Sequence, residues 1–317
     1  MTNPPPTAYG RPLKGATLAA QRSRFRGVHS ISFASMLPVL VVTGTVFVLW
    51  YAVSLWLNAP QVIERFDAKP YSFQELATGT WNMERPVLPT PHQIARNFFE
   101  SVFTEDLDSP RNLLLHAGVT LQSTLLGFAM GVILGVLIAV QIVHSPWLDR
   151  SLMPWVVASQ TIPILAIAPM IVVVLGSLGW PMLVPKAIIS MYLCFFPVTI
   201  GMVKGLRSPD PLQMDLMRTY SASKSQTLSL LRLPASLPFL FASAKVAIVA
   251  SLIGAIVGEL PTGAQSGLGA RLLSGSYYGQ TVQIWSALLM ASLLGVGLVS
   301  AVQWAQHLTG KQMGART

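Results

Sequence analysis

The chain has 317 residues, of which 52% are hydrophobic and only 10% are charged. This composition is typical of a protein that crosses a membrane several times, because a soluble protein of this length needs a more highly charged surface. Basic segments between apolar runs explain the formal net charge of +9, so the charge does not indicate a nucleic-acid partner. The single cysteine, Cys194, excludes an intrachain disulfide, and its apolar surroundings predict an inert core residue.

The amino-terminal segment, residues 1–32, carries five Lys or Arg side chains and no Asp or Glu. We expect a cytoplasmic tail, because positive charge holds flanking segments on the cytoplasmic side. Contact with anionic membrane lipid is an alternative role for the same charges. The apolar run 33–57 is long enough to span a bilayer and has no small-residue cleavage site just after it, which favours a first transmembrane helix over a signal peptide.

Residues 58–111 form a polar stretch with eight acidic and five basic side chains. Its net charge is opposite in sign to that of the amino terminus, which predicts a loop on the outer side of the membrane. Thr90, Pro91 and Gln93 have the pattern of an N-cap, a first-turn proline and a capping-box partner. We therefore expect a helix here, lying either along the outer interface or against the transmembrane bundle.

Residues 112–306 are predicted to form a membrane core of five further spans. The second span of the chain, at about 116–143, belongs to a stretch without Asp, Glu, Lys or Arg. Gly127, Gly131 and Gly135 recur every fourth residue in it. Such a face lets another helix approach closely, so we interpret it as a packing surface.

The third span, at about 151–175, is interrupted by prolines. A proline leaves backbone carbonyls unpaired unless neighbouring helices or water satisfy them, so Pro163 and Pro169 are candidates for lining a wet path. The fourth span, at about 183–203, contains Lys186 near its outer end, where the side chain can snorkel to the interface.

The fifth span, at about 237–260, contains Lys245 and Glu259. A charge at mid-membrane costs about 3 kcal/mol, so Lys245 is expected to face the bundle interior, a partner subunit or water. The two residues are separated by about 21 Å along one helix, so each needs its own partner or water. Both are candidates for the translocation path. A sixth span at 282–304 leads to a short basic cytoplasmic tail, 307–317.

Between the fourth and fifth spans, residues 204–236 form a loop with net positive charge, which predicts a cytoplasmic location. Leu212, Leu216 and Tyr220 recur every four residues, so they share one face of an expected short helix. Asp215 lies on the opposite face. Apolar side chains on a short surface helix indicate docking rather than a simple connector.

A second short helix is expected in the same loop. Ser223 and Gln226 have the capping-box spacing that starts a helix. It is predicted to run to Leu231 and to end at Pro234 and Pro238, because proline lacks the backbone donor that a helix interior requires.

This loop resembles the EAA loop of the membrane subunits of ABC importers, which reads Glu-Ala-Ala, three residues, Gly, nine residues, Ile, one residue, Leu-Pro. The spacing is kept throughout, at Asp215, Leu216, Met217, Ser221, Leu231, Leu233 and Pro234. Only Leu233 and Pro234 match strictly, whereas Asp215 keeps the carboxylate. Ser221 replaces a glycine that adopts a left-handed turn easily. The resemblance assigns these seven positions to an ATPase-coupling loop.

The flanking segments look like permeases of the nitrate, taurine and sulfonate type, and the resemblance covers roughly Val87 to Gln306. It is carried by VLPTPHQIARNFF, SPWLDRSLMPWVVASQTIPILAIAPMIVVVLGSLG and RLPASLPFLFASAKVAIVASLIGAIVGEL. It implies an all-α membrane protein with six transmembrane helices, a type I-like importer permease bundle and cytoplasmic coupling helices. Both termini would be cytoplasmic, and the location would be the bacterial inner membrane.

The resemblance also implies partners. A second permease copy would enclose the path, two ATPase subunits would bind the coupling loops, and a soluble substrate-binding protein would deliver a small organic or oxyanion solute. ATP and Mg²⁺ would be held by the ATPase subunits. The chain itself is expected to be neither an enzyme nor a metalloprotein, because it lacks G-x-x-x-x-G-K-[ST] and has no His, Cys and carboxylate cluster with metal-ligand spacing. His116, His144 and His307 lie at expected span ends and are interpreted as interfacial.

Two other functions compete with this interpretation. A secondary transporter driven by an ion gradient would use Lys245 and Glu259 as coupling charges, but such proteins usually show internal repeats and more intramembrane ionisable groups. We find neither in the sequence. The other is a scaffold subunit that anchors an ATPase without transporting a solute.

Overall fold

The computed structural model describes residues 33–66, 70–261 and 266–312. The tail expected at 1–32 lies outside the described residues, as do the last five residues of the tail expected at 307–317. All regular elements in the described part of the chain are helical. The chain divides into two compact units, Met1–Ala52 and Val53–Thr317, and the division falls inside helix α2 (Phe33–Arg65).

The described part of the first unit is the amino-terminal half of α2. Its side chains are apolar and exposed, with Val39 at 65% and Val48 at 69% of full exposure. The segment Leu37–Arg65 is long and apolar enough to cross a membrane. Exposed aliphatic side chains of this kind are the ones that the hydrocarbon of a bilayer would cover.

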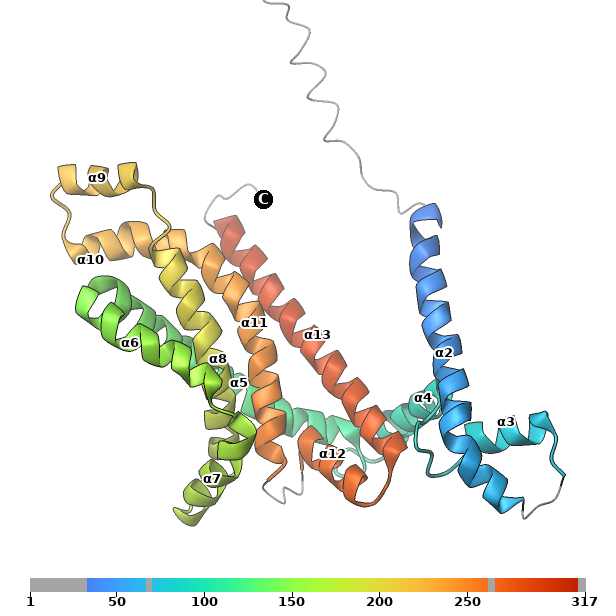
Figure 1. Cartoon of the computed structure of the whole chain (residues 1–317). Helices are drawn as coiled ribbons and strands as arrows, with labels where there is room; N and C mark the ends of the chain where they lie inside the picture. The colour runs from blue at the N-terminus through green and yellow to red at the C-terminus, as the bar shows by residue number, and fades with distance from the viewer. Residues whose placement is uncertain (1–32, 67–69, 262–265, 313–317) are drawn as a thin grey trace, which may run out of the picture. The chain divides into compact units, whose positions relative to one another are not determined.

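The second unit is built on three long helices that pack closely together: α5 (Leu113–His144), α8 (Leu183–Leu206) and α11 (Leu233–Glu259). Figure 1 shows α13 (Thr281–Gln312) beside α11, with which it is in contact. One core cluster joins the three central helices and includes Ala139, Ile142, Cys194, Val198, Met202 and Ala247. The buried thiol of Cys194 confirms the interpretation of that residue as part of the core.

The glycine face of α5 packs directly on α8, as its spacing predicts. A Cβ atom at Gly131 would stand only 2.7 Å from the Sγ atom of Cys194. At Gly127 and Gly135 the added atom would be equally crowded by α8. Hydrogen atoms at these positions therefore set the close separation of the two helices.

Five described helices are long and apolar enough to span a membrane, and a sixth span results if one bent pair counts as a single crossing. The pair consists of α6 (Pro146–Ala158) and α7 (Ile164–Ser177), with an angle of 96° between them after the short turn η3 (Ser159–Thr161). The interruption that the prolines predict for the third span is therefore present, as a sharp bend. Pro163 is the N-cap of α7, and the residue before a proline disfavours the helical conformation, so the chain breaks there.

Three shorter elements contact one end of the bundle: α4 (Pro91–Phe99), the π turn η2 (Glu100–Thr104) and α12 (Leu268–Tyr277). A fourth, α3 (Phe73–Trp81), meets the second half of α2, where Gly79 lies against Val62. The capping box expected at the start of α4 is present. The hydroxyl of Ser286 on α13 donates to the carbonyl of Ile94, and the side chain of Ile94 is buried. Of the two alternatives for this helix, packing against the bundle is therefore the observed one.

Figure 1 shows the opposite end of the bundle, where α9 (Pro211–Thr219), α10 (Lys224–Thr227) and the π turn η4 (Leu228–Arg232) connect α8 to α11. The expectation that Pro234 and Pro238 end the second short helix is wrong, because the chain continues in helical form into α11. Pro234 falls in the first turn of α11, directly after the π turn η4, so the irregular turn takes up the proline without ending the helix.

Candidate functional site

Two capping boxes fix the short helices of the loop. Asp210 begins α9, and its Oδ1 atom accepts a hydrogen bond from the backbone N–H of Leu212 at 3.0 Å. Ser223 begins α10 with the capping box that the sequence predicts, and the backbone N–H of Gln226 donates to its hydroxyl. Between them, Ser221 has a φ of 50°, in the left-handed region where the related loops carry glycine.

One side of α9 presents apolar side chains to the surroundings. Leu212, Leu216 and Tyr220 are 78%, 55% and 76% exposed, and no residue of α9 is buried. Asp215 lies on the same helix and forms an exposed ion pair with Arg218, with 2.9 Å between Oδ1 and Nη1. The stripe predicted from the four-residue spacing therefore exists, and the residues that the structure describes leave it exposed.

The other side of α9 faces the bundle. Met214 and Met217 are half-buried and line a hollow of about 320 Å³ beneath the helix. The end of α5 contributes Val143 and His144 to the same hollow, and three cations complete its wall: Arg218, Lys224 and Arg232. The sequence motif pairs Leu216 with Met217, but the structure separates them, because Leu216 points outward and Met217 points inward.

The last three motif positions attach the loop to the bundle. Leu231 is half-buried in η4, and Leu233 packs against the core cluster of α5 and α8. Pro234 is exposed in the first turn of α11. Motif residues of the loop thus form an exposed group on α9 and an anchoring group at the start of α11.

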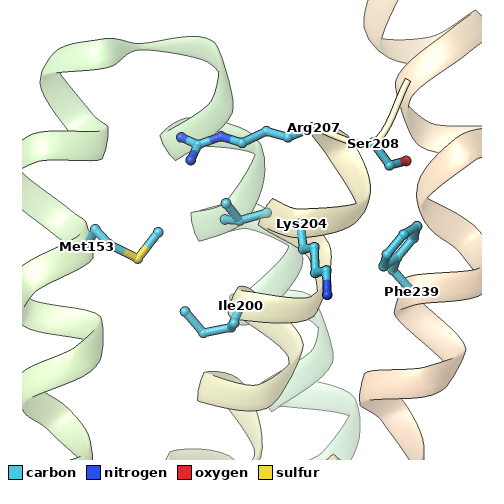
Figure 2. Close-up of a pocket in the computed structure, with 7 residues that line it drawn as sticks. Met153, Ile200, Lys204, Arg207, Ser208 and Phe239 are labelled. Carbon is cyan, nitrogen blue, oxygen red and sulfur yellow. The ribbon is translucent and has the colours of Figure 1, made fainter. Parts of the chain in front are cut away.

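A second hollow, of about 500 Å³, opens at the same end of the bundle between α6, α8 and α11. Figure 2 shows Arg207 of α8 at the top of this hollow and Lys204 lower down, between Phe239 on one side and Met153 and Ile200 on the other. The Nη2 atom of Arg207 lies 2.7 Å from the Oδ2 atom of Asp149. This ion pair ties the end of α8 to the first turn of α6.

The residues proposed for the translocation path do not form one group. Pro163 and Pro169 are exposed at the break before α7 and within it, and Lys245 is half-exposed on α11. Glu259 is completely buried at the far end of α11. Because α11 is one unbroken helix, Glu259 and Lys245 cannot contact each other, as the sequence predicts.

Glu259 instead lies beside Lys186, with 3.9 Å between Oε1 and Nζ. The side chains are 0% and 5% exposed, so the expectation that Lys186 snorkels to the interface is wrong. The reason is that the chain before α12 covers this end of α8, where the Nζ atom also donates to the carbonyl of Ser266 at 3.5 Å. A buried ion pair of this kind needs further hydrogen bonds to offset its desolvation.

Thr120 and the start of α12 provide those hydrogen bonds. The backbone N–H of Gly269 donates to Oε2 of Glu259 at 2.8 Å, and the hydroxyl of Thr120 donates to the carboxylate at 3.0 Å. The same hydroxyl accepts from the N–H of Leu268 at 2.9 Å. The carboxylate therefore sits at the amino end of α12, where the helix dipole favours negative charge.

His116 extends this cluster, although the sequence interpretation placed it at the interface. It is 1% exposed; its Nδ1 atom accepts from the N–H of Gly267 at 2.9 Å, and its Nε2 atom lies 2.8 Å from the carbonyl of Pro110. An accepting Nδ1 and a donating Nε2 define the neutral imidazole. The missed signal is the four-residue spacing of His116 and Thr120, which places two polar side chains on one face of an apolar helix. We name Lys186, Glu259, Thr120 and His116 the clamp cluster.

The possible metal ligands are scattered across the part of the chain that the structure describes. No group of three or more His, Cys, Asp or Glu side chains there could hold a metal ion. The polar groups of the clamp cluster are instead occupied by one another and by the backbone.

Comparison with known proteins places this geometry in context. Residues 131–314 match the family described as "Binding-protein-dependent transport system inner membrane component". A probable ABC transporter permease protein of Haemophilus influenzae is 30% identical, over 70% of this chain and 85% of its own length. The formylaminopyrimidine transport permease protein ThiX of Halalkalibacterium halodurans is 31% identical over 70% and 84%. The putative aliphatic sulfonates transport permease protein SsuC of Bacillus subtilis is 26% identical over 66% and 72%.

Proposed function

We propose, from the premise that the chain belongs to the family of binding-protein-dependent transport system inner membrane components, that its α9–α10 loop couples it to a separate ATPase subunit. As a member of this family, the chain is a multi-pass permease subunit of an ABC importer in the inner membrane. It is a transport component rather than an enzyme. In this proposal ATP and Mg²⁺ are bound by the partner ATPase.

The observation that carries the proposal is the exposed apolar side of α9. Leu212, Leu216 and Tyr220 project from a short helix at the end of the bundle, on the side away from its half-buried methionines. A helix of this size gains little stability from exposed apolar side chains unless a partner covers them. Asp215 is exposed on the same helix and would offer a carboxylate to the same partner.

The attachment of the loop determines how its movement would reach the transmembrane helices. Movement of α9 acts on α8, which precedes it, and on α11, which follows it through η4. Leu233 packs into the core shared with α5, and the Arg207–Asp149 ion pair links α8 to α6. Closure of two ATPase subunits would therefore displace four helices of the bundle together, and this displacement would alternate access between the two sides.

A second copy of the chain would complete the translocation path as a homodimer. The broken α6–α7 pair and the exposed face of α11 are the surfaces we assign to that path, which places Pro163, Pro169 and Lys245 along it. The hollow in Figure 2 then forms its cytoplasmic mouth. Membrane lipid would cover the remaining apolar surface. A soluble binding protein would deliver a small organic or oxyanion solute, a range that includes the solutes named for ThiX and SsuC.

Orientation follows from the charge asymmetry of the loops, with α9, α10 and both termini in the cytoplasm. A cysteine at Ser276, which is exposed on α12, should react with an impermeant thiol reagent from outside. One at Ser225, exposed on α10, should react only after permeabilisation, in a Cys194→Ser background. Labelling of Ser225→Cys from outside would reverse the arrangement.

Uptake into vesicles tests the function itself. We expect the chain reconstituted with its partner ATPase subunit to take up solute only when ATP is present, and the chain alone to take up none. ATP-independent uptake that follows an ion gradient would instead favour a secondary transporter. Leu212→Ala combined with Leu216→Ala should abolish ATPase co-purification and uptake together, while the purified variant keeps the thermal stability of the parent.

A further inference from the structure

The hollow beneath α9 gathers positive charge from three consecutive elements of the chain. Arg218 comes from the last turn of α9, Lys224 is the first residue of α10, and Arg232 is the last residue of η4. None of the described residues in its wall is Asp or Glu. Its volume of about 320 Å³ lies at the lower end of the range of pockets that bind small ligands. An anion in this hollow would therefore contact all three elements at once.

The carboxylates of this part of the chain do not neutralise that charge. The acidic side chains of residues 144–236 are Asp149, Asp210 and Asp215. Asp149 is paired with Arg207, and Asp210 accepts a hydrogen bond from the backbone at the start of α9. Asp215 is paired with Arg218, so it balances one of the three cations. Lys224 and Arg232 form no ion pair with any described residue. Their charge is left for an anion that is not part of this chain.

The hollow lies at the depth of the lipid headgroups. The apolar span Leu113–His144 ends with a residue of its wall, and the span Lys224–Glu259 begins with another. At 1.5 Å per residue the first span is about 48 Å long, whereas a bilayer with its headgroups is about 40 to 45 Å thick. Its end therefore reaches the polar boundary of the membrane. Trp147, just after His144, is 83% exposed, and tryptophan is enriched at that boundary.

We propose that the hollow beneath α9 binds the phosphate group of an anionic phospholipid from the adjoining membrane leaflet. Guanidinium and ammonium groups are strong partners of phosphate oxygens, and basic pockets between transmembrane helices on the cytoplasmic side bind anionic headgroups. Val143, Met214 and Met217 give the wall an apolar part, which suits the glycerol ester beside the phosphate.

A lipid bound in this hollow would brace the α9–α10 loop against the end of α5. Arg218, Lys224 and Arg232 belong to the loop, whereas Val143 and His144 belong to α5, and the same ligand would touch both sides. The charge of the surrounding lipid would then regulate how firmly movement of α9 is passed to the bundle. This regulatory role rests on the proposed coupling function, whereas the binding of lipid does not.

Native mass spectrometry of the full chain, released from micelles of a non-ionic detergent, tests the binding without the ATPase. Titrations with phosphatidylglycerol and with phosphatidylcholine of the same acyl chains would count the bound lipids. We expect one tightly bound phosphatidylglycerol per chain, and binding of the zwitterionic phosphatidylcholine that is weaker by about tenfold or more. Inorganic phosphate, added at the concentration of the lipid, should not displace phosphatidylglycerol. Equal affinity for the two lipids, or displacement by inorganic phosphate, would overturn the assignment to an anionic lipid.

Variants assign the bound lipid to this hollow. Lys224→Gln and Arg232→Gln should each weaken phosphatidylglycerol binding about fivefold, the scale of one basic side chain beside anionic lipid. Lys224 is exposed, so its replacement does not endanger the fold. Arg150→Gln is the matched control, because Arg150 is an exposed cation near the start of α6 that does not line the hollow. Binding that survives the double variant Lys224→Gln with Arg232→Gln, or that falls equally in Arg150→Gln, would overturn the proposal.

Reconstituted complexes separate lipid binding from ATPase docking. In nanodiscs that contain phosphatidylglycerol, solute-stimulated ATP hydrolysis should differ from that in phosphatidylcholine alone. The double variant Lys224→Gln with Arg232→Gln should lose this difference while the ATPase still co-purifies. Loss of co-purification, as expected for Leu212→Ala with Leu216→Ala, would instead assign the two cations to the ATPase interface and overturn the proposal. Absence of lipid binding would leave ATP-dependent uptake intact, so this proposal and the proposed function fail independently.

Discussion

The two ends of α11 are built in different ways. At its start, the α9–α10 loop is held by hydrogen bonds between residues two to four positions apart, such as those of Asp210 with Leu212 and Ser223 with Gln226. At its end, the clamp cluster joins Thr120 to Glu259 across 139 positions of sequence and is buried. Local bonds keep the loop folded, and the hollow beneath α9 and the packing of Leu233 join it to the bundle. Long-range buried bonds hold the helices together at the other end, so under the proposed coupling the clamp cluster would be the rigid end against which the loop moves.

The largest effect is expected from breaking the ion pair of the clamp cluster. Lys186→Met leaves the carboxylate of Glu259 buried without its cationic partner, which commonly costs about 3 to 5 kcal/mol of the free energy of unfolding. Thermal unfolding in detergent should show a large fall in midpoint. The double variant Lys186→Met with Glu259→Gln should recover most of it, because no charge is then left buried. If the Lys186→Met variant is as stable as the parent, the Lys186–Glu259 ion pair does not hold this end of α11 more firmly than local hydrogen bonds hold the loop.

A glycine tests how tightly the clamp cluster is closed. Gly267 has a φ of 123°, and a Cβ atom there would lie 2.3 Å from the Cδ atom of Glu259. Gly267→Ala should therefore lower the free energy of unfolding by about 1 to 3 kcal/mol, through backbone strain and through the displaced carboxylate. Gly279→Ala is the control, because Gly279 also has positive φ, at 64°, but has no atom within 4 Å of the added Cβ. Equal losses of unfolding free energy in the two variants would show that backbone strain alone accounts for the effect and that contact with Glu259 contributes nothing.

In the loop, the two faces of α9 should respond differently. Leu216→Ala should weaken ATPase binding by about 2 kcal/mol, the scale of a central interface residue, with little change in thermal stability. Met217→Ala should weaken binding less and stability more, because Met217 lines the hollow beneath α9. The comparison requires both a binding measurement and a melting curve for each variant. If Met217→Ala has the larger effect on binding, the apolar stripe is not the docking face.

The smallest effect is expected at the turn between the short helices. The left-handed conformation at this position costs an ordinary residue about 1 kcal/mol, and glycine adopts it without that cost. Ser221→Gly should therefore raise stability slightly, and ATPase stimulation should persist. Ser221→Val, with a branched side chain at the same φ, should lower both. A stimulated hydrolysis assay in vesicles, alongside the melting curves, separates the turn from the docking face. Loss of stimulation in Ser221→Gly would mean that the hydroxyl itself contributes to coupling.

Features set by neighbouring residues were predictable from the sequence. The capping boxes at Thr90 and Ser223 and the glycine face of α5 were expected, and the structure contains them. Each depends on a spacing of three or four residues, which fixes the local geometry without knowledge of the rest of the fold. The left-handed turn at Ser221 was indicated by its position in the motif.

The clamp cluster was not predictable in the same way. Lys186 has a plausible position at a span end, where snorkelling is the ordinary outcome, and only the chain before α12 reveals that this end is covered. The pairing of Lys186 with Glu259 depends on how α8 and α11 pack, and no sequence spacing records that. The separation of Leu216 from Met217 likewise follows from the side of α9 that meets α5.

The bend between α6 and α7 limits what can surround it. At 1.5 Å per residue, the two helices are each only about 20 Å long, whereas the hydrocarbon layer of a bilayer is about 30 Å thick. If the pair forms one crossing, its break falls within that layer, where lipid cannot satisfy backbone groups. The hydroxyl of Tyr192 accounts for one of them, because it donates to the carbonyl of Ser159 at 2.5 Å. The break must therefore be sheltered by protein or wetted from an aqueous cavity, and its amides should exchange their hydrogens faster than those of the unbroken helix α8 behind it.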